Sequence, residues 1–138
     1  MTNNSSFIKS VQERKRKVYT YGVFDLMHYG HIRLLKKAKA LREYLIVGVY
    51  TDDVAEGFKR RPILTQEERL QNIKELGIAD EVVLLDKFVP DPDVDIVAKA
   101  EGAGWSKDET PEFYCKTKLL NYTEGISTSE IIKRIHER

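Results

Sequence analysis

Short apolar runs alternate along this chain with segments of helical period, and this order most constrains its fold. Residues 18–23 are rich in β-branched and aromatic side chains, which favour a strand. Residues 44–50 and 81–85 are apolar nearly throughout, as expected for strands of a parallel sheet that is covered on both faces. Apolar side chains recur at helical spacing at Ile32, Leu35, Ala38 and Leu41, and again at Leu70, Ile73 and Leu76. This order predicts an α/β fold, with a parallel sheet and flanking helices.

The rest of the chain carries weaker signals. The helix expected over residues 66–76 follows a threonine that suits an N-cap and ends at a glycine. Prolines and glycines interrupt residues 86–115, so that residues 94–98 fit either a strand or the start of a helix. Residues 115–120 alternate as a late strand, and residues 127–130 form a capping box that begins a final helix.

Length and charge limit the classes of protein to consider. A chain of 138 residues, 41% of them hydrophobic, suffices for one domain with a core and is too short for two ordinary ones. We therefore expect a flexible N-terminal tail over residues 1–16 and a single domain over residues 17–138. A formal net charge of +1 gives no reason to expect binding to nucleic acid or to an anionic membrane.

The cysteine content and the apolar runs bear on the compartment. Cys115 is the only cysteine, so the chain has neither an internal disulfide nor a zinc site of several cysteines. Residues 1–10 lack the apolar core of a signal peptide, and no run approaches the roughly 20 residues that span a bilayer. We expect a cytoplasmic protein that has no membrane partner and no metal site of its own.

The sequence His28-Tyr29-Gly30-His31 follows the first strand and opens the first helix. The first amides of a helix have no backbone partner and lie at the positive end of its dipole, which favours anions. Two imidazoles beside those amides can hydrogen-bond phosphate oxygens, and the glycine lets a nucleotide approach the backbone. The alternative is that both histidines merely occupy a helix start. The strand and helix that flank the motif favour a polyphosphate site.

Two further segments can reach the same end of a parallel sheet. One is the basic run over residues 59–62 with Arg69 on the following helix, whose cations suit a triphosphate and the pyrophosphate that leaves. The other is residues 123–129, where hydroxyls accompany the free amides of another helix start. Each has a plainer interpretation: the basic run as a solvated loop, and Ser127 as a cap only. Asp25 is either a turn residue, which we favour, or a carboxylate linked to Mg²⁺.

Three strings in this order, YGVFDLMHYGH (residues 21–31), QEER (residues 66–69) and TEGISTS (residues 123–129), resemble those of the cytidylyltransferase family. The resemblance is strongest to small glycerol-3-phosphate cytidylyltransferases and to the catalytic domains of phosphocholine and phosphoethanolamine enzymes. It covers about residues 17–85 and 115–136. It implies the Rossmann-like fold of nucleotidyltransferases that carry an H-x-G-H motif, and a homodimer.

The resemblance also implies the chemistry. An oxygen of an alcohol phosphate attacks the α-phosphorus of CTP and pyrophosphate leaves, without a covalent enzyme intermediate. The implied catalytic residues are His28, His31 and Arg69. The implied nucleotide- and phosphate-binding residues are Val23, Phe24, Asp25, Gly30, Arg60, Arg61, Thr123, Glu124, Gly125, Ser127, Thr128 and Ser129. Mg²⁺ arrives with the nucleotide and screens the β- and γ-phosphates. Glycerol 3-phosphate is the favoured acceptor, since the chain is short and lacks a membrane-binding amphipathic extension.

Two departures from the family pattern leave alternatives open. Tyr122 stands where the family usually has an arginine, and residues 102–105 read GAGW where small members carry two carboxylates. The preference for CTP is therefore less secure than the class of reaction. One alternative is an adenylyltransferase that uses ATP and acts on a sugar phosphate or a flavin nucleotide. Another is a nucleotide-binding protein of the same fold with weakened turnover.

Overall fold

A five-stranded parallel sheet forms the centre of the molecule. The computed structural model describes residues 16–87, 94–100, 116–121 and 123–138. The strands are β1 (Lys17–Gly22), β2 (Tyr44–Tyr50), β3 (Glu81–Leu85), β4 (Ile96–Ala100) and β5 (Lys116–Leu120). They pair in the order β3-β2-β1-β4-β5, and every pairing is parallel. The α/β prediction is thereby confirmed.

Four helices are described beside these strands. They are α2 (Tyr29–Lys39), α3 (Asp52–Phe58), α4 (Gln66–Leu76) and α5 (Thr128–Glu137). Thr65 caps α4 as predicted, because its side chain accepts from the Glu68 amide, and Gly77 ends the helix in the left-handed conformation. α3 was not predicted, although Thr51 is an N-cap and two aspartates fill the first turn.

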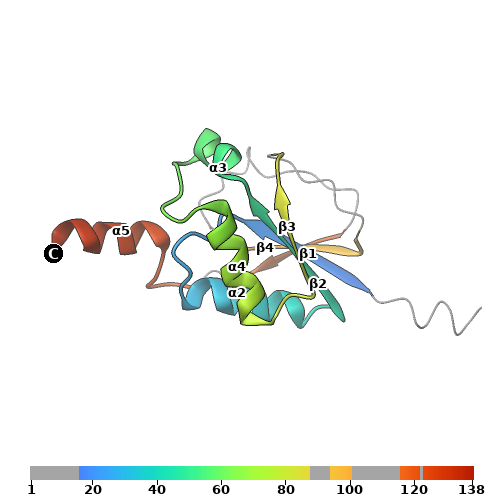
Figure 1. Ribbon diagram of the computed structural model, residues 1–138. Helices are drawn as coiled ribbons and strands as arrows, with labels where there is room; N and C mark the ends of the chain where they lie inside the picture. Colours follow the sequence, from blue (N-terminus) through green and yellow to red (C-terminus); the bar gives the residue numbers. More distant parts are fainter. Residues whose placement is uncertain (1–15, 88–93, 101–115, 122) are drawn as a thin grey trace, which may run out of the picture.

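Side chains alternate between the two faces of the sheet. Val18 in β1 packs in one cluster with Leu35 of α2 and Ile73 of α4, all fully buried. Figure 1 shows α2 and α4 on the same side of the sheet. The other face carries an aromatic cluster that includes Tyr19 and Tyr50. The two hydrophobic faces explain why the strands read as continuous apolar runs.

The strand order fixes where a ligand site belongs. The chain crosses from β1 to β2 and β3 on one side, and β4 and β5 lie on the other side of β1. In open parallel sheets ligands bind beyond the carboxyl ends of the strands at such a reversal. Residues 94–98, left open between strand and helix, contribute to β4, which pairs with both β1 and β5.

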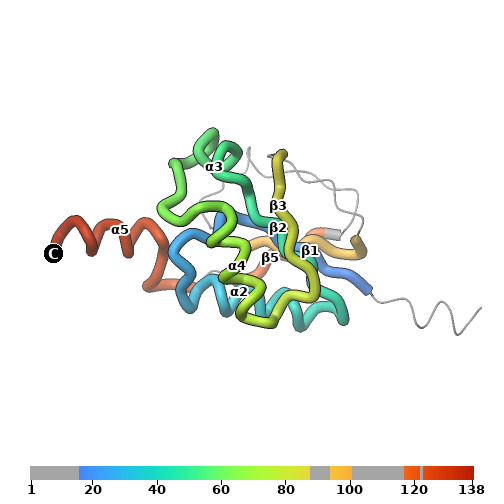
Figure 2. Tube along the Cα trace, in the orientation of Figure 1, coloured from blue at the N-terminus to red at the C-terminus, as the bar shows by residue number. Residues whose placement is uncertain are grey.

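The last helix extends away from the rest of the structure. In the Cα trace α5 leads outward from the loop after β5, and the C-terminus lies at its far end (Figure 2). Its start is fixed by Ser127, whose hydroxyl accepts from the Glu130 amide at 3.1 Å, which is the N-cap half of the predicted capping box. Among the described residues, no helix has the length and apolar character needed to cross a bilayer. The tail expected over residues 1–16 lies outside the described residues except for Arg16.

Candidate functional site

The turn that leaves β1 has an unusual backbone. Phe24 and Leu26 have positive φ angles of 55° and 49°. Residues other than glycine adopt this backbone region at a cost of about 1–3 kcal/mol. Asp25 lies between Phe24 and Leu26 and is 3% exposed. Such strain persists only where surrounding contacts hold the backbone in place. The turn leads directly into the histidine motif at the start of α2.

The two histidines form a reciprocal cap on α2. The Nδ1 atom of His28 accepts from the Gly30 amide at 3.1 Å, and the Nδ1 atom of His31 accepts from the His28 amide at 3.2 Å. The rings are stacked with their centroids 3.8 Å apart. Since each Nδ1 atom offers its lone pair to a backbone N–H, each neutral ring carries its proton on Nε2. The cap therefore leaves two Nε2–H donors for a ligand.

Both imidazoles favour the neutral form. Burial, together with the nearby His28 and Lys59, lowers the pKa of His31 to about 3. Burial also lowers the pKa of His28. At neutral pH the pair consists of hydrogen-bond donors without charge. Such donors can stabilise negative charge that develops on a phosphate.

We expect this pair to make stability depend on pH. The unfolded chain takes up a proton on histidine near pH 6.5, whereas folded His31 does so only near pH 3. Between these values the unfolded state binds more protons, so the free energy of unfolding should fall as pH decreases from about 6.5. Urea unfolding at pH 7, 6 and 5 should give a steeper decline for the wild type than for His31→Asn. Equal declines would contradict the pKa direction.

Two adjacent cavities open at this end of the sheet. The imidazole cavity, about 300 Å³, is lined by both histidines, Gly30, Asn121 and residues of the segment that caps α5, namely Thr123, Ile126, Ser127, Thr128 and Ser129. The aromatic cavity, about 210 Å³, is lined by Tyr21, Phe24 and Phe58 together with Val23, Asp25, Lys59, Arg60 and Lys99. Both are also lined by His31 and Lys59. The three segments singled out from the sequence therefore meet at one place.

Most of the predicted site residues line one of these cavities. The exceptions are Arg61, Arg69, Glu124 and Gly125. Gly125 has a φ of 88°, so glycine suits the bend that brings the segment to α5. Gly30 is needed for a different reason than expected, because a Cβ there would lie 2.9 Å from the ring of His28. Tyr122, Cys115 and residues 102–105 lie outside the described residues.

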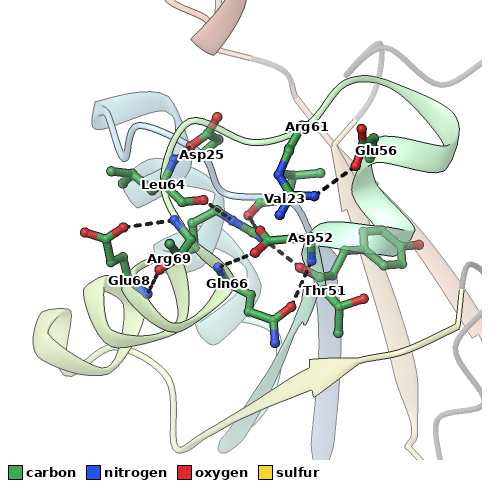
Figure 3. A network of polar contacts seen from close by, with 12 residues as sticks. Val23, Asp25, Thr51, Asp52, Glu56, Arg61, Leu64, Gln66, Glu68 and Arg69 are labelled. Carbon is green, nitrogen blue, oxygen red and sulfur yellow. Dashed lines mark hydrogen bonds and ion pairs between the residues drawn. The ribbon is translucent and has the colours of Figure 1, made fainter.

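The structure gives Arg69 a different role from the phosphate contact expected. Its side chain is fully buried, and the guanidinium donates to the carbonyls of Leu64 at 3.1 Å and of Val23 and Tyr50 at 2.8 Å each. It also pairs with the Asp52 carboxylate at 2.8 Å. Figure 3 shows these contacts converging on the guanidinium from several elements. Arg69 therefore holds loops in place and does not face either cavity.

Asp25 and Arg61 also differ from the phosphate-binding roles that the resemblance implies. The two carboxylate oxygens of Asp25 accept from the backbone amides of Ile63 and Leu64, at 2.8 and 2.9 Å. The favoured interpretation as a turn residue agrees with these contacts, whereas a direct phosphate contact does not. Arg61 is exposed and pairs with Glu56 at 2.9 Å. It lines neither cavity, and its partner is a carboxylate on α3.

The described lining of the aromatic cavity contains three cationic side chains, Lys59, Arg60 and Lys99. Lys59 belongs to the predicted basic run, whereas Lys99 of β4 was not predicted. Burial lowers the pKa of both ammonium groups. Arg60 donates to the Ser129 hydroxyl at 3.3 Å, and its buried Nε atom has no partner among the described residues. A lysine at the carboxyl end of a strand beside the reversal point is the signal that could have identified Lys99.

Comparisons with known proteins agree with this arrangement. A family model described as cytidylyltransferase-like matches residues 19–113. Choline-phosphate cytidylyltransferase 2 of Arabidopsis thaliana is 36% identical over 141 residues, which cover 91% of this chain and 46% of that protein. Bifunctional protein HldE of Helicobacter pylori is 36% identical over 138 residues, which cover 93% of this chain and 29% of that protein. The chain thus spans less than half the length of these two relatives.

One solved structure is similar to this chain over the whole length of the solved protein. The lipopolysaccharide core biosynthesis protein of Thermoplasma volcanium superposes with a TM-score of 0.63 and 25% identity, covering 82% of this chain and 100% of that one. An Archaeoglobus fulgidus protein of unknown function superposes with a TM-score of 0.59 at 20% identity, and this likeness concerns the fold alone. The fold of this chain therefore belongs to a known architecture.

Proposed function

Because this chain belongs to the cytidylyltransferase-like family, we propose that it transfers CMP from CTP to a small alcohol phosphate. An oxygen of the acceptor phosphate forms a bond to the α-phosphorus. The bond from that phosphorus to the bridging oxygen breaks, and pyrophosphate leaves with the electron pair. The observation that carries the proposal is the pair of neutral Nε2–H donors that faces the start of a second helix across one cavity.

The imidazole cavity suits the nucleotide. His28 and His31 donate from Nε2 to phosphate oxygens, and the free amides at the starts of α2 and α5 add further donors. Asn121 and Thr123 at the rim carry amide and hydroxyl groups of the kind that recognise a ribose or a base. The donors stand ready before the reaction, so that charge moving from the α-phosphorus to pyrophosphate is stabilised without rearrangement.

The aromatic cavity suits the acceptor. It adjoins the imidazole cavity, and His31 and Lys59 line both. An acceptor phosphate in the aromatic cavity therefore lies beside the α-phosphate of a nucleotide in its neighbour. Lys59 and Arg60 neutralise the two like charges that must approach each other. Positioning and charge stabilisation then supply the catalysis, as phosphoryl-transfer chemistry requires.

The charges in the aromatic cavity favour a polyol phosphate over an amino-alcohol phosphate. Its described lining holds the cations Lys59, Arg60 and Lys99 and one carboxylate, that of Asp25, whose oxygens already accept two amides. An ammonium group on the acceptor would meet three positive charges. A glycerol phosphate offers hydroxyls and negative charge instead. Glycerol 3-phosphate therefore stays our favoured acceptor.

Mg²⁺ fits this site as a companion of the nucleotide. Among the described residues, no group of three or more histidine, cysteine or acidic side chains is arranged to hold a metal ion. Mg²⁺ commonly keeps several waters and binds through substrate phosphates, so it needs no cage of side chains. When bound to the β- and γ-phosphates it neutralises part of the charge on the pyrophosphate that leaves.

Pyrophosphate release from CTP and ATP, measured side by side with a panel of acceptors, tests the proposal. The panel contains glycerol 3-phosphate, a sugar 1-phosphate, phosphocholine and phosphoethanolamine, each with Mg²⁺. We expect turnover with CTP and glycerol 3-phosphate. Turnover with ATP alone would favour an adenylyltransferase. Tight binding of CTP in calorimetry without any release would favour a nucleotide-binding protein that does not turn over.

We predict that Lys99→Met raises KM for glycerol 3-phosphate about tenfold and leaves KM for CTP unchanged. The substitution removes one charged hydrogen-bond donor from the aromatic cavity, and such bonds contribute about 1.5–3 kcal/mol. Initial rates at saturating CTP and varied acceptor measure the effect. Lys118→Met, at an exposed position on β5, is the matched control. A rise in KM for CTP instead would indicate that the aromatic cavity binds the nucleotide, contrary to our assignment.

The homodimer implied by the resemblance is part of this proposal. Analytical ultracentrifugation of the purified chain distinguishes a dimer from a monomer. We also propose that the protein works in the cytoplasm, and cell fractionation tests this location.

A further inference from the structure

Asp25 contacts both of the other phosphate-facing segments. Its carboxylate accepts from the Ile63 and Leu64 amides, which immediately follow the basic run. Its backbone carbonyl accepts from the Thr128 hydroxyl at 2.7 Å, in a bond buried between the β1 turn and the start of α5. The residue itself belongs to the turn that leads into the histidine motif. One aspartate thus joins the three segments through three hydrogen bonds.

The same contacts leave Asp25 and Thr128 without a hydrogen-bond donor for a phosphate, although both line the cavities. A carboxylate that is 3% exposed and already accepts two amides is a poor partner for a phosphate, which is itself an acceptor. Thr128 is 8% exposed, and its single hydroxyl proton is used in the bond to Asp25. It cannot donate the same proton to a phosphate. Both residues therefore act through their neighbours.

These bonds also stabilise an otherwise unfavourable backbone. Phe24 and Leu26, on either side of Asp25, have left-handed φ angles. If the bonds to Asp25 were lost, the turn could relax and change the distance between the imidazoles and the basic run. Phosphate groups held by three segments at once are sensitive to such a change, because a misplacement of about 1 Å can reduce rates on the order of 100-fold.

We propose that Asp25 is a positioning residue that sets the spacing of the histidine motif, the basic run and the start of α5. The inference rests on the proposed function, since it concerns the phosphates that those segments bind. Asp25 holds Arg60 near Ser129 through the loop at Ile63 and Leu64, and it holds α5 through Thr128. It is neither a metal ligand nor a phosphate ligand.

Thr128→Val and Thr128→Ser form the first test. Valine keeps the shape of threonine and removes the hydroxyl, whereas serine keeps the hydroxyl. We expect Thr128→Val to raise KM for CTP about tenfold and Thr128→Ser to restore most of the loss. A substitution that only destabilised the protein would reduce the active fraction and so lower kcat, but it would leave KM unchanged. Equal KM values for wild type and Thr128→Val would overturn the proposal.

Asp25→Asn is the second test, with Asp53→Asn at an exposed carboxylate of α3 as its control. The asparagine NH₂ group faces a backbone N–H, so one of the two amide bonds is lost. We expect KM for CTP to rise about tenfold while the Mg²⁺ concentration for half-maximal rate stays within twofold. A tenfold increase in that concentration would identify Asp25 as a metal ligand and overturn the inference.

Calorimetry with CTP distinguishes failure of the proposed function from failure of the inference about Asp25. If the wild type releases no pyrophosphate, the proposed function fails. The inference is then decided by the dissociation constant for CTP, which should increase about tenfold in Asp25→Asn and Thr128→Val and recover in Thr128→Ser. Affinities equal to that of the wild type in both variants would reject the inference whether or not the wild type turns over.

Discussion

Replacing His31 by asparagine should lower kcat about 100-fold or more and leave the fold intact. The Oδ1 atom of asparagine can take the place of Nδ1 and accept from the His28 amide, so the cap on α2 is preserved. Asparagine is too short to replace the Nε2–H donor. Removal of one such preorganised donor at developing charge typically reduces kcat by 10²–10³. Initial rates and circular dichroism of the purified variant measure the two effects separately.

His31→Gln should give the opposite pattern. Its longer side chain carries an amide N–H close to the position of Nε2, but it loses the cap at His28. We expect more activity than in His31→Asn and a lower free energy of unfolding, by about 1 kcal/mol. His136→Asn, at an exposed position on α5, should change neither quantity. An asparagine variant with near wild-type kcat would remove His31 from the reaction.

Local signals account for the elements that the sequence predicted well. The helix α4 and the strands β2 and β3 have the predicted bounds, because caps and continuous apolar runs act within a few residues. β4 could not be assigned, since prolines and glycines interrupt residues 86–115 and the short apolar run over residues 94–98 suits both a strand and a helix. Its pairing with β1 decides the matter, and that pairing depends on residues far apart in the sequence.

The site was predictable to the extent that its chemistry is local. The histidine motif combines a strand end, a helix start and two imidazoles within a few positions, so its place in the fold follows from the sequence. The roles of Asp25 and Arg69 do not, because their partners lie on other elements. Carbonyls and amides are the same in every residue, and no side-chain pattern marks the ones that a buried charge will contact. Lys99 carries no motif, and its position at the carboxyl end of β4 becomes informative only once the strand order is known.

The buried arginine leads to the prediction with the largest effect on stability. Arg69→Ala should lower the free energy of unfolding by about 3–5 kcal/mol, the range observed when one partner of a buried ion pair is removed. It leaves the carbonyls of Val23 and Tyr50 without this donor and Asp52 without its counter-charge. Urea unfolding at pH 7 measures the loss.

Arg61→Ala is the matched control, because Arg61 is exposed and its pair with Glu56 is solvated. Its effect should stay within about 0.5 kcal/mol. The comparison of Arg69 with Arg61 distinguishes a structural arginine from one that binds the nucleotide, which the sequence alone does not. If Arg69 served the nucleotide, its alanine variant would unfold like the wild type and bind CTP weakly. If Arg69 holds the loop after β1, as its contacts indicate, its alanine variant has a lower free energy of unfolding. Activity is then also lost, because the turn at Val23 is displaced.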